Sequence, residues 1–456
     1  MEKEKEMTNY LDQAQHVVRQ AATRGVEAEA IVIDEQETTI RVDRGQVERL
    51  SQSGSRGLGV RIIDGGRVGY AYTSDLTSSG IEETWQAALS LARVATSDEY
   101  RALPDPQPIP DRELEIWDPN LPAVPTREKI VLAKRIEQAA LACDPRVAMT
   151  NRCTYQDAIS HVYLANSRGF AGAYDRTVVF SYVIGIGRDE EGQTMAVGLG
   201  ASNFFQELDA QAIGREAGRR AVQLLGGQSV ETQTATVVFD PMVAAEILGY
   251  LSLALTAEAM QRGRSFLIGK MGRQVGSDRV SLLDNGRLKR GLASAPFDGE
   301  GVPTSATRLI DEGVLQNVIY DTYTARKDGV ASTGNAQRSS HRSPPGLAPS
   351  NFYLQPGHHS PEEIIAGVDR GLYVTRIMQT GGTDPITGDC SMGASGLWIE
   401  NGQLTRPVSG VTVATTLSDL LQNIVAVGND LRVVPFTGAI GAPTIRVEGV
   451  TIGGRK

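Results

Sequence analysis

The stretch GDCSMGASGLWIENGQ, residues 388–403, gathers side chains that could do chemistry in a glycine-rich segment. Cys390 is a candidate nucleophile, and Ser391 and Ser395 offer hydroxyl groups. A reactive thiolate needs a nearby imidazolium, cation or helix N-terminus to lower its pKa, yet no histidine lies within thirty residues of Cys390. Neither serine has glycines two positions before and after it, as a nucleophile elbow requires. We therefore expect Cys390 to be a packing residue and the serines to bond backbone amides in a turn.

A zinc site is equally hard to build from this sequence. The chain has five histidines and none is followed by glutamate, so the motifs HExxH and HExxxH are absent. His358 and His359 are adjacent, and because consecutive side chains diverge, we interpret them as a solvated pair. The three cysteines are widely spread and form no CxxC pair. The 54 acidic residues leave an all-oxygen calcium or magnesium site open.

Composition limits the class of protein. The chain of 456 residues has 45 basic and 54 acidic residues, a formal charge of -9, which argues against a nucleic-acid surface. No apolar stretch approaches the roughly 20 residues of a membrane span, and the charged start MEKEKEMTNYLDQ lacks the apolar core of a signal peptide. An odd number of cysteines fits a reducing compartment. We expect a cytoplasmic protein with neither a nucleic-acid nor a membrane partner.

The elements that position these residues follow from hydrophobic periodicity. Apolar residues at three- and four-residue spacing predict a first helix that ends at Gly25. Five short β-rich runs between Ala28 and Tyr72, with a turn at Asp64–Gly66, predict an antiparallel meander. A second helix is predicted to start at an N-cap Ser79 and to pack on this sheet through Trp85, Leu89 and Leu91.

The same order of elements then recurs. A proline-rich segment, RALPDPQPIPDRELEIWDPNLPAVP, predicts an irregular strap on the surface. A helix at 126–143, further strands and a helix at 207–225 repeat the pattern of helix, meander and helix. We therefore predict an α+β fold with an N-terminal domain, 1–228, in which helices pack on antiparallel meanders. The following domain, 229–456, is predicted to be predominantly antiparallel β, with one helix at 242–261, two short helices and hairpins at Glu312-Gly313 and Asn401-Gly402.

Several extended motifs, in order along nearly the whole chain, resemble the TldD/PmbA metallopeptidases. They are RVDRGQVERLSQSGSRGLGVRIIDGGRVGYAYTSDL, GNAQR, PSNFYLQPG, TDPITGDCSMGASGLWIENGQLTRPV and NIVAVGNDLR. The TldD branch of that family carries HExxxH on the helix after the first strand of its second domain, together with a late cysteine. Here the corresponding helix reads PMVAAEILGYLSLALTAEAMQ, the metal positions fall near Leu248, Gly249 and Leu253, and the tail has no cysteine. The chain is therefore similar to the PmbA branch, also called TldE.

This resemblance implies a function that depends on a partner. PmbA-like chains pair with a TldD-like subunit that bears HExxxH and holds the zinc, so no catalytic residue, metal ligand or cofactor is expected in this chain. The heterodimer would enclose a channel for unfolded or short peptides and act in proteolysis and peptide-antibiotic maturation. Residues expected to line or support that channel are Thr383, Asp384, Asp389, Cys390 and Ser391.

Two alternatives stay open. The chain could be a stand-alone peptide-binding or scaffold homologue without catalytic activity, and it could form a homodimer when alone. It could also be an independent hydrolase that uses Cys390 or carboxylates. A homologue with HExxxH in the same genome would distinguish the heterodimer from the stand-alone protein.

Overall fold

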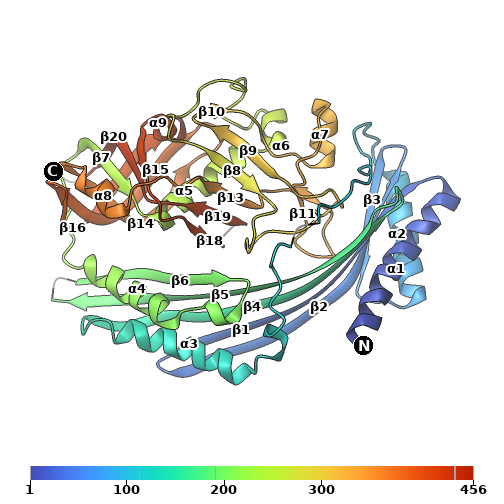
Figure 1. The fold of residues 1–456 in the computed structure, drawn as a ribbon, viewed down its shortest axis with the longest axis horizontal. Helices are drawn as coiled ribbons and strands as arrows, with labels where there is room; N and C mark the ends of the chain where they lie inside the picture. The colour runs from blue at the N-terminus through green and yellow to red at the C-terminus, as the bar shows by residue number, and fades with distance from the viewer. Residues whose placement is uncertain (1, 112, 191, 436–437, 455–456) are drawn as a thin grey trace.

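The first half of the chain is built on a single sheet of long strands. The structure, a computed structural model, describes residues 2–111, 113–190, 192–435 and 438–454. The sheet has six antiparallel strands in the order β3-β2-β1-β4-β5-β6. Their bounds are β1 (Glu27–Asp43), β2 (Gln46–Asp64), β3 (Arg67–Thr73), β4 (Val147–Asn166), β5 (Ala171–Asp189) and β6 (Gly192–Ser202). The two predicted meanders therefore join edge to edge through β1 and β4 into the curved sheet of Figure 1.

The strands are fewer and longer than the sequence suggested. The first two predicted runs are both part of β1, and the next two are both part of β2. The backbone pairing between β1 and β2 continues through the pair Gln36↔Gly54. The predicted turn at Asp64–Gly66 is confirmed: Gly65 and Gly66 have φ of 54° and 78°, a region that favours glycine.

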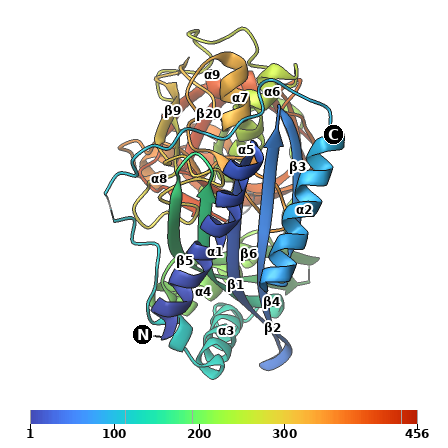
Figure 2. The same ribbon diagram turned by 90° about the vertical axis from the view of Figure 1, so that its right-hand side faces the viewer.

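Four helices pack on one face of this sheet. They are α1 (Glu2–Arg24), α2 (Ser78–Val94), α3 (Thr126–Leu141) and α4 (Ala210–Gln223). The first two cover Ala28, Ala30 and Val32 of β1, and the last two cover Ile40 and Val42 at its other end. These residues alternate along one strand, so α1 and α2 lie on the same face as α3 and α4. Figure 2 shows α1 and α2 lying along the strands.

The prediction for α2 needs two corrections. Its N-cap is Thr77, whose side chain accepts from Gly80 N, and not Ser79. Trp85 and Leu89 are buried as expected, but Leu91 is 49 % exposed. The positions that share the buried face are three and four residues apart, and Ala88 and Ala92 occupy the places next to Trp85 and Leu89.

The second half contains two more sheets. One has the order β16-β15-β14-β7-β20-β17, and because β16 also pairs with β20, five of its strands form a closed ring. Its strands are β7 (Gln233–Phe239), β14 (Arg370–Thr383), β15 (Asp389–Glu400), β16 (Gln403–Thr416), β17 (Ile424–Val427) and β20 (Ile445–Gly453). The other has the order β10-β9-β8-β13-β19-β18, with β8 (Leu282–Asn285), β9 (Ala306–Asp311), β10 (Val314–Leu315), β13 (Asn351–Leu354), β18 (Arg432–Val434) and β19 (Ala439–Ala442). Most pairs are antiparallel, but β7 with β14 and β13 with β19 are parallel.

Short elements complete the second half. The helix predicted at 242–261 is split at Leu255 and Thr256 into α5 (Pro241–Ala254) and α6 (Ala257–Gln261). The remaining elements are α7 (Thr322–Asp328), α8 (Pro361–Ala366), α9 (Leu417–Gln422) and the two-residue strands β11 (Ala336–Gln337) and β12 (Gly346–Leu347). Both predicted hairpins are confirmed, as β9 with β10 and β15 with β16. The α+β class is thus confirmed.

The second half of the chain packs on the face of the long sheet that the helices leave open. Phe180, Tyr182 and Val197 of that face pack against the core of the second half. The predicted strap lies between α2 and α3 and runs past both halves in Figure 1. It buries Leu103 and Leu121, and Leu114 O accepts a hydrogen bond from Arg290 N at 2.7 Å. The strap therefore helps to hold the halves in place.

Candidate functional site

The β14–β15 hairpin brings together the five residues expected to line a channel. Thr383 and Cys390 stand opposite each other in the ladder, and Thr383 Oγ1 lies 3.9 Å from Cys390 Sγ as its hydrogen-bond donor. The turn is closed by Asp384 N, which donates to Asp389 O at 2.9 Å, and by Gly388 N, which donates to Asp384 O at 2.8 Å. Most of the stretch 388–403 therefore forms β15, the second strand of this hairpin.

Alternation along β15 places these side chains on two faces. Asp389 and Ser391 are exposed, whereas Cys390 is 1 % exposed and belongs to the core of the second half. Burial raises the pKa of Cys390 to about 11, so its thiol is protonated at neutral pH. A buried, protonated thiol is not an activated nucleophile.

Helix α5 directly follows β7 and carries the three positions that the resemblance to the TldD branch suggested for the metal motif. Of the positions named from the sequence, Leu248 is 1 % exposed in the core, whereas Leu253 is 48 % exposed. Gly249 is half-buried, and a Cβ at that position would meet nothing within 4 Å. Leu248 therefore lies on the core face of α5, and Gly249 and Leu253 lie on its other face.

The residues of α5 do not fit a zinc ion. Glu246 is the only acidic residue of α5, and the helix has no histidine or cysteine. HExxxH with its glutamate at Glu246 would place the two histidines at Ala245 and Tyr250, and the hydroxyl of Tyr250 instead donates to Thr380 Oγ1 at 2.7 Å. Within the ranges that the structure describes, no three His, Cys, Asp or Glu side chains are grouped to hold a metal ion.

Glu246 lies in a hollow that the sequence did not reveal. The hollow has a volume of about 190 Å³ and lies between the ends of β5 and β6, α4, α5 and β14, with Arg220 and Arg376 also lining it. Burial raises the pKa of Glu246 and lowers that of Arg376. The one signal in the sequence was an acidic residue in an otherwise apolar helix.

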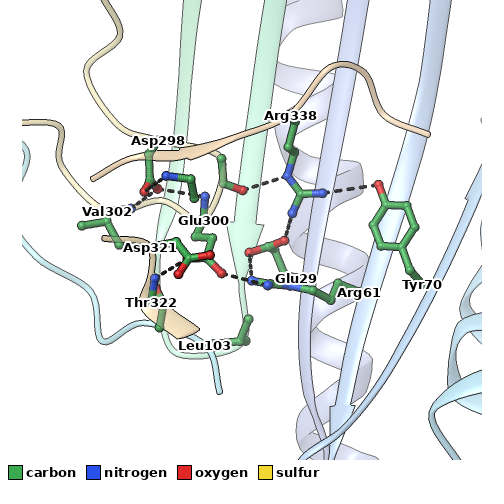
Figure 3. A network of polar contacts seen from close by, with 12 residues as sticks. Glu29, Arg61, Tyr70, Leu103, Asp298, Glu300, Val302, Asp321, Thr322 and Arg338 are labelled. Carbon is green, nitrogen blue, oxygen red and sulfur yellow. Dashed lines mark hydrogen bonds and ion pairs between the residues drawn. The ribbon is translucent and has the colours of Figure 1, made fainter. Parts of the chain in front are cut away.

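A second polar group joins the two halves and was also missed. Arg61 of β2 donates from Nη2 to Glu29 Oε2 and from Nη1 to Glu300 Oε1, each at 2.8 Å. Arg338 forms an ion pair with the other oxygen of Glu29 and a hydrogen bond with Tyr70 Oη (Figure 3). The four charged side chains are at most 7 % exposed.

These charges depend on one another. Burial alone would lower the pKa of Arg61, but the charges of Glu29 and Glu300 outweigh it and raise this pKa. Burial alone would raise the pKa of Glu300, but the charge of Arg61 together with hydrogen bonds from Thr322 and Arg61 outweighs it and lowers this pKa. Both partners are therefore charged at neutral pH, and we name Glu29, Arg61, Glu300 and Arg338 the buried ion network.

One finding concerns membranes. Among the helices in the described part of the chain, none has both the length and the apolar character needed to cross a bilayer.

Comparison with known proteins places the whole chain in one family. Residues 28–92, 119–225 and 232–454 match the first, central and C-terminal domains of the PmbA/TldA metallopeptidases. The metalloprotease PmbA of Escherichia coli O157:H7 is 32 % identical over 416 residues, which cover 89 % of this chain and 88 % of that protein.

Solved structures agree in fold. A Thermotoga maritima protein, described as a candidate modulator of a DNA gyrase, has a TM-score of 0.90 and 28 % identity, and the match covers 97 % of this chain and 99 % of that one. TldE from Thermococcus kodakarensis has a TM-score of 0.88 and 22 % identity, over 97 % of this chain and 100 % of that one, and this likeness concerns the fold alone. From these matches, the chain belongs to the PmbA/TldD metallopeptidase family.

Proposed function

We propose that this chain is the metal-free subunit of a TldD/TldE-type heterodimeric zinc metallopeptidase that acts on unfolded or short peptides. The observation that carries the proposal is helix α5. It is the helix that the resemblance matches to the zinc helix of the TldD branch, but it provides one glutamate and no histidine. A chain that keeps the fold of a metallopeptidase, and whose described residues offer no group of metal ligands, would need a partner to supply them.

The β14–β15 hairpin is the part of this chain that we assign to the shared channel. Asp389 and Ser391 would contact the peptide because their side chains are exposed. Thr383 and Cys390 would support the strand from the buried side, and Asp384 would fix the turn through its backbone bonds. An extended peptide can pair its backbone with a strand edge, which gives affinity with little side-chain preference. We further propose that the complex works in the cytoplasm and matures peptide antibiotics.

The test is co-expression with a homologue from the same source that bears HExxxH. The pair is purified through a tag on this chain and assayed for zinc and for hydrolysis of an unstructured peptide, with each chain alone as control. We expect about one zinc per pair, in keeping with one catalytic site, and cleavage only by the pair. Zinc-dependent hydrolysis by this chain alone would refute the proposal.

Two other outcomes are assigned in advance. A metal-free homodimer that binds peptides without cutting them, together with failure to bind the homologue, would establish the stand-alone binding protein instead. Hydrolysis that is lost in Cys390→Ala but kept in Cys143→Ala would establish an independent thiol hydrolase. The burial of Cys390 argues against that last result.

A further inference from the structure

A cavity of about 320 Å³ lies between the long sheet and the loops of the second half. Its floor is formed by residues of β1, β4 and β5 on the sheet face opposite the helices. Its roof is formed by residues 293–304 and 334–339 together with Ser350. The cavity is distinct from the β14–β15 hairpin and from the hollow at Glu246, with which it shares no lining residue.

The floor is ordered in rows because the register of the three strands fixes which side chains are neighbours. Ile31 pairs with Leu164, and Ile33 pairs with Val162, which in turn pairs with Tyr174 of β5. These rows are apolar. The next row along the strands is polar, and consists of Glu35, Ser160 and Arg176 in that order across β1, β4 and β5.

Exposure shows where the cavity opens. Along the floor face of β1, Ile31 is 3 % and Ile33 is 8 % exposed, Glu35 is half-buried, and Glu37 is exposed. Glu35 and Arg176, which are both half-buried, therefore lie toward the mouth, and the apolar rows lie at the inner end.

The inner end is closed by an aromatic ring. Phe297 of the roof is 1 % exposed and meets Tyr174 and Phe170 edge-on, with ring centroids 5.1 and 5.0 Å apart. A Cβ on Gly172 would approach the Phe297 ring to 2.8 Å, so a glycine at this position allows the ring to pack directly against the backbone of the sheet. The apolar end is thus preformed, as small-molecule pockets usually are.

The mouth has two opposite charges that do not pair with each other. Arg176 forms no hydrogen bond or ion pair with any residue that the structure describes, and Glu35 accepts a hydrogen bond from Ser160 Oγ at 3.3 Å. Burial and the neighbouring Glu37 raise the pKa of Glu35, while the charge of Arg176 acts in the opposite direction. Because adjacent strands are about 4.8 Å apart, β1 and β5 hold these two side chains on backbones about 10 Å apart.

We propose that this cavity binds a free α-amino acid with a bulky apolar side chain, such as leucine or phenylalanine. Its ammonium group lies on Glu35, its carboxylate lies on Arg176, and its side chain enters the apolar end under Phe297. The ammonium group compensates the half-buried carboxylate of Glu35, and the carboxylate of the ligand gives the guanidinium of Arg176 a planar partner that no residue described by the structure provides. A cavity of this volume is at the small end of the range for ligand pockets, as a single amino acid requires. The site lies within one chain, so it does not depend on the proposed partner or on peptide hydrolysis.

The test is titration calorimetry of the full chain with leucine and phenylalanine. We expect binding of both, and affinity lower by about tenfold or more for glycine, leucinamide and N-acetyl-leucine, which lack the side chain, the carboxylate and the ammonium charge respectively. Arg176→Met and Glu35→Gln should each weaken leucine binding by about tenfold or more. Arg188→Met, on an exposed position of the same strand, is the matched control and should bind normally.

A third variant tests the site even if the two charge variants fail to fold. Val162→Phe adds bulk to the second apolar row of the floor and leaves both charged residues in the chain, so it should remove leucine binding while the urea midpoint stays close to that of the parent. Three results would overturn the proposal. These are no binding of leucine or phenylalanine, equal binding of leucinamide or N-acetyl-leucine, and an Arg176→Met protein that binds as well as Arg188→Met.

Discussion

Removing Arg61 from the buried ion network should destabilise the protein far more than removing an exposed ion pair of the same length. Arg61→Met keeps most of the side-chain volume but deletes two ion pairs of 2.8 Å. Glu29 retains Arg338, whereas Glu300 loses its cation and is 3 % exposed. Breaking a buried pair by removing one partner costs about 3–5 kcal/mol. Because one carboxylate rather than two is left unpaired, we expect the lower part of that range, about 3–4 kcal/mol.

The measurement is urea unfolding followed by tryptophan fluorescence. The chain has three tryptophans, of which Trp85 is buried in the first half and Trp398 in the second, while Trp117 packs in the first half. Versions that keep only Trp85 or only Trp398, with Trp117 replaced in both, report on each half separately. Arg262→Met is the matched control, because Arg262 also pairs at 2.8 Å, with Glu258, but the two side chains are 59 % and 48 % exposed. Such an i,i+4 pair contributes about 0.3–0.5 kcal/mol.

A second substitution tests the stated cause. Glu300→Gln in the Arg61→Met background removes the unpaired charge, and a glutamine oxygen can still accept from Thr322 N, now 3.0 Å from Glu300 Oε2. This double variant should be more stable than Arg61→Met alone. If Arg61→Met costs no more than Arg262→Met, or if Glu300→Gln recovers nothing, the network does not stabilise the fold in the way that the burial and geometry indicate.

Three further changes test other parts of the structure. Neither ring nitrogen of buried His341 has a hydrogen-bond partner among the described residues, and burial lowers its pKa. The free energy of unfolding should therefore fall as the pH drops below about 6.5 toward the lowered pKa. His341→Leu should reduce the difference between the free energies of unfolding at pH 7.5 and pH 5.5, and an unchanged difference contradicts this. With a pKa of about 11, Cys390 should resist iodoacetamide at pH 8 in the folded protein while half-buried Cys143 reacts, and mass spectrometry showing equal labelling would refute it. Gly198→Ala puts a Cβ 2.0 Å from a backbone oxygen of α4 and should cost about 1–3 kcal/mol. Gly249→Ala has free space and should stabilise by about 0.5–1 kcal/mol in the same urea assay, so equal effects would exclude the packing argument.

The sequence predicted the order of the elements well and the length of the strands poorly. Near Ala28, β1 has apolar residues on both faces because helices cover one face and the second half covers the other. Farther along, Gln36 and Glu37 are exposed, so the apolar pattern stops although the backbone pairing with β2 continues through Gly54. The hydrophobic pattern follows burial, and burial is interrupted at Gln36 and Glu37 before apolar burial resumes at Ile40, while the backbone pairing continues without a gap. This is why two strands were predicted as four runs.

The polar groups were missed for a different reason. In the sequence Glu29 and Arg61 are ordinary polar residues of strands, and their partners lie 309 and 239 positions away at Arg338 and Glu300. No local pattern shows which charged residues of a strand will be covered by a distant loop. The same holds for Glu35 and Arg176, because the three-strand register had to be known before they could be placed in one row.

Helix α5 shows what a resemblance to a family can and cannot establish. The resemblance to the TldD branch suggests metal positions near Leu248, Gly249 and Leu253, although the side chain of Leu248 is packed in the core. Glu246, Tyr250 and Leu253 are separated by three or four residues and share the face that turns away from that core. Half-burying Glu246, with which none of the described residues forms an ion pair, costs stability, so an apolar residue there would suit a helix that needed only to pack. The acidic side chain therefore marks the face of α5 at which a function of this chain should first be tested.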